Sequence, residues 1–124
     1  MCIRDSLHSV GTADRRRSHP FSPLSQTHTH THTQGYNREK EYIATQGPLP
    51  DTVGDFWRLV WDYNIPTVVM LTNLMEKMKV KCTQYWPDTG SQQYANINVT
   101  LINTIQQADF IIRHFQIKDV SYKR

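Results

Sequence analysis

Apolar residues recur at helical spacing in the segment that follows Pro50. Spacings of three and four residues place them on one face of a helix. Thr52 is expected to cap the amides of the first turn, and Asp55 can reach back to the Thr52 amide. The pattern therefore predicts a buried helix around which the rest of the chain is organised. The residues of this face are Val53, Phe56, Trp57, Val60 and Trp61.

Several shorter segments have the pattern of β-strands. Residues 42–45 form a short β-prone run that Gly47 and Pro48 end, since proline has no amide hydrogen for a ladder. Residues 67–72 form an unbroken apolar run, which predicts a strand covered on both faces. The polar stretch 73–79 is expected to be a loop or hairpin tip, and residues 80–85, 97–101 and 110–117 are expected to be strands.

Residues 1–34 show no periodic apolar face, and we expect this low-complexity leader to be disordered. It carries three arginines at 15–17 and a Thr/His repeat at 27–33. His28, His30 and His32 could bind a metal ion. The preferred alternative is that a CA dinucleotide repeat was read through into a coding exon beginning at Gly35, which makes the leader non-native and leaves no metal site.

The net charge of +3 and the pI near 9.0 would suit a nucleic-acid partner only if the charge were concentrated. Residues 35–124 hold ten basic and nine acidic residues, and they form no basic stripe. We therefore expect no nucleic-acid partner. No apolar run approaches the roughly 18 residues of a membrane span, so any membrane anchor is expected outside this chain.

The chain has two cysteines, Cys2 in the leader and Cys82 in a predicted strand. Two cysteines placed in this way give no disulfide framework, so a reducing, cytoplasmic location is the expectation. Cys82 is interpreted as a small core residue, which is the usual environment of a strand thiol.

Four motifs occur in order along the second third of the chain. They begin at Tyr42 (Tyr-Ile-Ala-Thr-Gln-Gly-Pro-Leu), Asp55 (Asp-Phe-Trp-Arg-Leu-Val-Trp), Val68 (Val-Val-Met-Leu-Thr-Asn) and Lys81 (Lys-Cys-Thr-Gln-Tyr-Trp-Pro). In this order and spacing they resemble the N-terminal half of the catalytic domain of cysteine-dependent protein-tyrosine phosphatases. The resemblance runs from about Gly35 to the C-terminus.

The resemblance implies a partial phosphatase domain over residues 35–124. The expected fold class is α/β (α+β), a fragment of a highly twisted mixed sheet flanked by helices. The order of the motifs around residues 72–87 resembles the receptor-type branch, which implies the cytoplasmic side of a plasma-membrane protein that acts in signal transduction. The intact family enzyme dephosphorylates phosphotyrosine in proteins through a cysteinyl-phosphate intermediate and needs no cofactor.

The family's nucleophile lies in a Cys-x5-Arg loop, where amides and the arginine bind phosphate and lower the thiol pKa. Neither cysteine fits, because His8 stands six residues after Cys2 and Asp88 stands six residues after Cys82. Asp88 also belongs to Trp-Pro-Asp-Thr-Gly, which spells the start of the family's acid loop. Its sequence context is that of an earlier strand, so Asp88 is predicted to be a turn residue. We therefore expect no catalytic residue in this fragment, and no activity.

Two residues resemble active-site support positions of the family. Glu76 resembles the carboxylate that holds the phosphate-binding arginine, and Lys81 resembles the lysine that reaches towards the closed acid loop. The alternative is that they are charges on a solvated hairpin tip. Met78 stands where relatives commonly have glycine.

Two hypotheses follow for the function. In the first, the chain is a fragment of a tyrosine phosphatase that acts on phosphotyrosine-containing proteins when intact. In the second, it is a catalytically inactive binding or decoy module derived from such a domain. An in-frame Cys-x5-Arg in the DNA downstream of Arg124 would favour the first.

Overall fold

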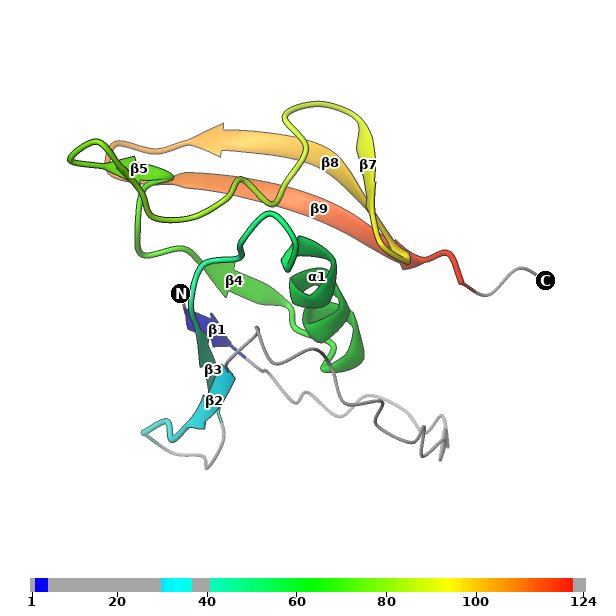
Figure 1. The fold of residues 1–124 in the computed structure, drawn as a ribbon, viewed down its shortest axis with the longest axis horizontal. Helices are drawn as coiled ribbons and strands as arrows, with labels where there is room; N and C mark the ends of the chain where they lie inside the picture. The colour runs from blue at the N-terminus through cyan, green and yellow to red at the C-terminus, as the bar shows by residue number, and fades with distance from the viewer. Residues whose placement is uncertain (1, 5–29, 37–40, 122–124) are drawn as a thin grey trace.

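The computed structural model describes residues 2–4, 30–36 and 41–121. Within these ranges the chain forms nine strands and one helix (Figure 1). This content confirms the α+β fold class predicted from the sequence. The elements are β1 (Cys2–Arg4), β2 (His30–Thr33), β3 (Tyr42–Thr45), α1 (Val53–Asp62), β4 (Thr67–Val69), β5 (Met75–Glu76), β6 (Lys79–Val80), β7 (Ser91–Tyr94), β8 (Ile97–Gln106) and β9 (Ile111–Asp119).

The strands of the described residues divide into three sheets. A four-stranded sheet has the order β2-β3-β1-β4, a two-stranded hairpin joins β5 and β6, and a three-stranded meander has the order β7-β8-β9. Every pairing among them is antiparallel. The meander is the largest unit, and its long β8–β9 hairpin lies above α1 in Figure 1.

Helix α1 buries one face, largely as the periodicity predicts. Four of the five predicted residues are buried, and Phe56 is fully enclosed. Trp61 is the exception, since 36% of its surface is exposed, and Leu59 is buried in its place. The prediction for Trp61 was wrong because the helix contacts the meander through β7, β8 and β9, which turns its packed face towards Leu59.

The start of α1 differs in detail from the predicted cap. The Thr52 hydroxyl makes no bond to the first-turn amides. Its Oγ1 accepts a hydrogen bond from the Leu49 amide at 2.9 Å, while the Thr52 amide donates to the Leu49 carbonyl at 2.9 Å rather than to Asp55. Thr52 therefore closes the turn before the helix, and this turn fixes the direction in which α1 begins.

The end of α1 is a Schellman motif. Asn64 adopts a left-handed φ of 49°. Its amide donates to the Trp61 carbonyl at 3.1 Å, and the Ile65 amide donates to the Val60 carbonyl at 2.9 Å. These bonds satisfy carbonyls that the helix itself leaves free, and Ile65 is buried beside them. Pro66 then prevents continuation, as the sequence predicts.

The hydrophobic core lies between α1 and the meander and extends to β3. It contains the buried face of the helix, the fully enclosed Ile97 and Val99 of β8, and Ile43 of β3. Helix α1 and the meander approach each other closely where Gly54 meets Ala95, in the turn between β7 and β8. A Cβ at Gly54 would lie 2.9 Å from the Ala95 Cβ, so the helix can sit this close only without a side chain there.

Two predicted strands are shorter than expected. Only Thr67–Val69 of the run 67–72 is a strand, and it lies at the edge of its sheet. Val68 packs against the core, whereas 71% of Leu71 is exposed, so the prediction of cover on both faces was wrong. In the run 80–85 the strand ends at Val80, because the next residues turn to pack against the loop 46–50 rather than continue the hairpin.

The predicted leader is described only at residues 2–4 and 30–34, and its other residues lie outside the described ranges. Both described stretches include strands, which was not expected: β1 and β2 pair with the two edges of β3. A strand with two unpaired edges presents backbone donors and acceptors that any extended segment can satisfy. The division of the chain at residue 35 stays a prediction.

Candidate functional site

The hairpin β5–β6 carries the two predicted support residues. Its two-residue turn is formed by Lys77 and Met78, with φ values of 48° and 64°. Positive φ at both positions is the type I′ geometry that suits a two-residue hairpin, and the second position normally favours glycine. The predicted hairpin tip is therefore confirmed, and Met78 adopts the conformation that explains a glycine at this position.

Glu76 lies on β5 and is half-buried. Its Oε1 accepts a hydrogen bond from the Asn73 amide at 3.2 Å. Across the hairpin, Glu76 is the register partner of Lys79. A carboxylate tethered by one amide keeps acceptor capacity on its other oxygen, which is the requirement for holding a guanidinium fork.

Lys81 follows β6 and is exposed. Its backbone amide donates to the Leu74 carbonyl at 2.8 Å, and the Cys82 amide donates to the same carbonyl at 3.3 Å. These bonds close the base of the hairpin and fix where Lys81 leaves it. In the described part of the chain, no hydrogen bond or ion pair joins Glu76 to Lys81, so the structure places them on one hairpin without bringing their charges together.

Cys82, two residues after the end of β6, is buried. Burial disfavours the thiolate and raises the pKa of the thiol. A Cβ on Gly47 would lie 2.8 Å from the Cys82 Sγ, and the Thr83 amide donates to the Pro48 carbonyl at 3.0 Å. The thiol thus fills the space against the loop 46–50, which confirms its interpretation as a core residue.

The segment after Cys82 attaches the site to helix α1. The Trp57 indole Nε1 donates to the Tyr85 carbonyl at 2.6 Å, and the rings of Phe56 and Tyr85 are 4.7 Å apart. Burial also raises the pKa of the Tyr85 hydroxyl. On the next residue, the Arg113 guanidinium lies 4.8 Å from the ring centre of Trp86, a cation–π distance.

Asp88 lies in the exposed bend that follows this segment, as predicted for a turn residue. Its Oδ1 accepts a hydrogen bond from the Gln84 side-chain amide at 2.9 Å. Gly90, two residues later, has a φ of 64°, which a glycine adopts at little cost. The carboxylate is therefore occupied in shaping the turn before β7.

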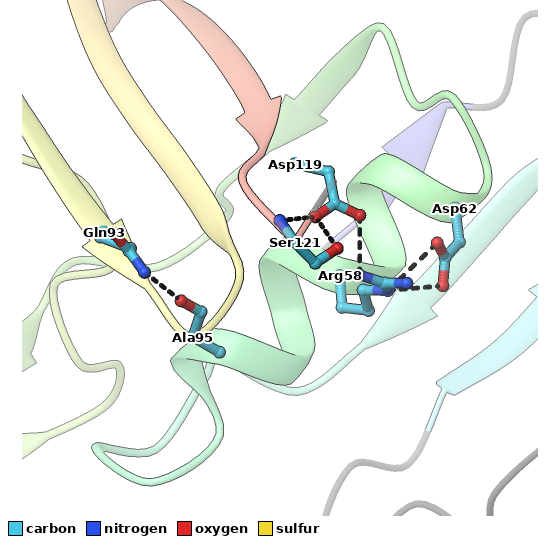
Figure 2. A network of polar contacts seen from close by, with 6 residues as sticks. All are labelled: Arg58, Asp62, Gln93, Ala95, Asp119 and Ser121. Carbon is cyan, nitrogen blue, oxygen red and sulfur yellow. Dashed lines mark hydrogen bonds and ion pairs between the residues drawn. The ribbon is translucent and has the colours of Figure 1, made fainter. Parts of the chain in front are cut away.

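A second polar group, centred on Arg58, was missed by the sequence analysis. The Arg58 Nη1 lies 3.0 Å from the Asp119 Oδ2, and its Nε lies 3.2 Å from Asp62 (Figure 2). Ser121 donates to the Asp119 Oδ1 from its amide at 2.8 Å and also from its hydroxyl. The helix is thereby tied to the end of β9.

The contacts of this group change the pKa of Asp119. Its side chain is almost fully enclosed, with 2% exposed, and burial alone would raise the pKa of the carboxyl. The hydrogen bonds from Ser121 and the charge of Arg58 outweigh burial and lower that pKa. The four-residue spacing of Arg58 and Asp62 could have indicated one pair, but no sequence signal links Arg58 to Asp119.

The described residues contain no group of three or more His, Cys, Asp or Glu side chains that could hold a metal ion. His28 lies outside these residues, while the ring of His32 is 5.6 Å from that of Tyr63.

In the same ranges, no helix has both the length and the apolar character required to cross a bilayer.

Comparison with known protein families matches residues 22–124 to the protein-tyrosine phosphatase family, and the chain belongs to that family. It is 54% identical over 83 residues to receptor-type tyrosine-protein phosphatase F of Rattus norvegicus. It is 50% identical over 86 residues to the Lar-like tyrosine-protein phosphatase of Caenorhabditis elegans and 47% identical over 90 residues to the human receptor-type phosphatase zeta. These matches take in 67%, 69% and 73% of this chain but only 4% of each relative.

Proposed function

We propose that this chain supplies the scaffold of a receptor-type phosphatase domain whose intact form hydrolyses phosphotyrosine in proteins on the cytoplasmic side of the membrane. The packing of the segment 81–87 carries the proposal. This segment joins helix α1 through the Trp57–Tyr85 hydrogen bond of 2.6 Å and joins the loop 46–50 through Cys82. Three of the four motifs that resemble the family, those that begin at Tyr42, Asp55 and Lys81, are thus packed against one another.

The chain alone is proposed to be inactive. Phosphate-ester hydrolysis by this family requires a thiolate, and Cys82 is a buried thiol with a raised pKa. An arginine should stand six residues later, where this chain has Asp88. Without both groups, neither the nucleophile nor the oxyanion stabilisation is present.

The test of inactivity is hydrolysis of an aryl phosphate by the purified 124-residue chain. We expect no turnover above that of a matched Cys82→Ser sample. Turnover that survives purification and disappears in Cys82→Ser would overturn the proposal of inactivity. Binding of a phosphotyrosine peptide, with no turnover and no binding of the unphosphorylated peptide, would instead support the binding-module hypothesis.

Glu76 is proposed to hold the phosphate-binding arginine of the intact domain. The carboxylate, which is half-buried beside the hairpin turn and tethered by the Asn73 amide, supports this role. Lys81 is proposed to contact the acid loop, because it leaves the same hairpin base with its side chain exposed.

Both roles can be tested in a chimera in which this chain replaces the matching 83 residues of the rat receptor-type phosphatase F. A charge-assisted hydrogen bond contributes about 1.5–3 kcal/mol, so Glu76→Gln should lower kcat/KM by about 10- to 100-fold. Lys81→Gln should lower kcat, whereas Lys79→Gln on the same hairpin should leave it unchanged. Equal effects of the two lysine variants would contradict the assignment to Lys81.

A further inference from the structure

The segment 81–87 begins at Lys81, and its other end lies against strand β9. The ring of Trp86 is buried there, with 9% of the residue exposed. Arg113 of β9 lies over this ring, and its guanidinium carbon is 4.8 Å from the ring centre. The meander therefore contacts, through a cation–π pair, the segment that carries one of the two candidate support residues.

In the described part of the chain, no hydrogen bond orients the Trp86 ring, because its indole Nε1 has no acceptor. The Gln84 side-chain amide donates to the Trp86 carbonyl at 3.1 Å, which holds the backbone but not the ring. The Tyr85 ring meets the indole edge-on, with the ring centres 4.9 Å apart and the planes at 82°. Among these contacts, the one with Arg113 fixes the face of the ring against a different strand.

The Arg113 side chain is available for this contact. It lies on β9 opposite Thr104 of β8 and is half-buried. Within the described ranges its guanidinium forms no ion pair. Burial raises the pKa of the Tyr85 hydroxyl, and the charge of Arg113 opposes that rise, so the charge acts on this aromatic pair. A cation that is partly desolvated over an indole is held more strongly than an exposed one.

Between Lys81 and Trp86 the segment is packed along its length. Cys82 fills the space against the loop 46–50, and the Tyr85 carbonyl is bonded to helix α1. Closely packed residues pass a displacement on to their neighbours rather than absorb it. A shift of the Trp86 ring is therefore expected to change the position of Lys81.

We propose that Arg113 is a positioning residue for Lys81. By holding Trp86, it fixes the segment 81–87 and with it the point at which the lysine side chain leaves the hairpin base. This role rests on the function proposed above, in which Lys81 contacts the acid loop of the intact domain. Side chains that act in catalysis require such support from residues that do not touch the substrate.

The kinetic test uses a receptor-type phosphatase domain in which residues 35–124 of this chain replace the matching segment. Arg113→Gln should lower kcat by about two- to tenfold and leave KM unchanged, as expected for the loss of a partly buried cation–π pair. Arg113→Lys keeps a cation that can lie over the ring and should recover part of the loss. Lys118→Gln removes a positive charge from an exposed position of the same strand and is the matched control.

A double-substitution cycle separates positioning from general loss of structure. In a Lys81→Gln background, Arg113→Gln should change kcat by less than about twofold, because no lysine remains to be positioned. Equal losses in both backgrounds, or an unchanged kcat in Arg113→Gln while Lys81→Gln is impaired, would overturn this inference and leave the proposed function intact. An unchanged kcat in Lys81→Gln would overturn the role of Lys81 and this inference together.

The contact can also be tested in the 124-residue chain without catalysis. The Trp86 indole N–H has no acceptor within the described ranges, so its protection from solvent exchange depends on the groups that cover it. Nuclear magnetic resonance, with the signal assigned by its loss in Trp86→Phe, should show several-fold faster exchange in Arg113→Gln and no change in Lys118→Gln. Equal exchange in the two variants would show that the guanidinium does not hold the ring, which would overturn the proposal.

Discussion

Strand β8 passes through two environments that its sequence does not distinguish. Near its start, Ile97 and Val99 are fully enclosed between the helix and the sheet, whereas 60% of Ile102 and 39% of Ile105 are exposed beyond the residues that pair with β7. The residue types are the same, and so is the β-propensity. What differs is the neighbour, because α1 and β7 cover only the first half of the strand. The comparison shows that an apolar pattern specifies a strand without specifying what packs on it.

Removing buried volume should separate the two halves of β8 most clearly. Ile97→Ala leaves a cavity in an enclosed site and should lower the free energy of unfolding by about 2–5 kcal/mol. The same substitution at Ile102, in the exposed second half of β8, should change it by less than about 0.5 kcal/mol. Urea denaturation of both variants measures the difference. Equal losses would show that the second half of β8 is packed in solution.

The two tryptophans of α1 offer a second comparison, between the packed and the open face of the helix. Trp57→Phe removes the hydrogen bond to the buried Tyr85 carbonyl and should cost about 1–3 kcal/mol, because that acceptor loses its partner. Trp61→Phe should cost less than about 0.5 kcal/mol, since Trp61 is exposed. Thermal unfolding followed by circular dichroism distinguishes them, and a larger cost at Trp61 would contradict the orientation of the helix.

Acid should weaken the tie between the helix and β9 before it affects the apolar core. Because folding lowers the pKa of Asp119, the unfolded chain binds the proton more readily. The stabilisation is therefore complete above the ordinary carboxyl pKa of about 4, and it is lost as pH falls through the lower folded value. Asp119→Asn should remove this part of the acid sensitivity. A pH series of unfolding midpoints that is unchanged by the substitution would show that the ion pair is not formed.

The smallest effect is expected at the tip of the β5–β6 hairpin, outside the packed core. Met78 has a φ of 64°, which costs a residue with a side chain more than it costs glycine. Since 92% of Met78 is exposed, Met78→Gly removes little packing and should stabilise the chain by about 0.5–1 kcal/mol. Lys79→Gly, within β6, should be destabilising. A loss of stability in Met78→Gly would indicate that the side chain packs against something at the tip.

Local sequence signals were sufficient to predict features that depend on neighbouring residues in the chain. The helix boundaries, the hairpin tip and the core position of Cys82 follow from periodicity, turn chemistry and the stop at Pro66. Pairing partners could not be predicted in the same way. The strands β1 and β2 pair with β3 because both edges of β3 are unpaired without them. The pattern of apolar residues along the chain does not show which strand edges are unpaired. The prediction that residues 67–72 are covered on both faces was wrong for the same reason. An apolar run does not show how many elements pack against it.

The candidate site shows the same limit. Glu76 and Lys81 are candidates because of motif resemblance, and the structure adds the hairpin on which Glu76 lies and which Lys81 follows. The Arg58–Asp119 pair joins residues that are far apart in sequence, and no spacing rule can reach across that distance. Its detection required the three-dimensional approach of α1 to the end of β9.

The contact between Gly54 and Ala95 links the variation allowed at two distant positions. Alanine at 54 would favour the helix by about 1 kcal/mol, yet its Cβ would collide with that of Ala95 at 2.9 Å. Ala95 also has a φ of 51°, so glycine there would relieve both the collision and the backbone. The effect of a substitution at either position on stability therefore depends on the residue at the other. Alanine at position 54 is therefore tolerated only after Ala95, about forty residues away, has been replaced by glycine. The order in which the two substitutions arise decides whether the intermediate is stable.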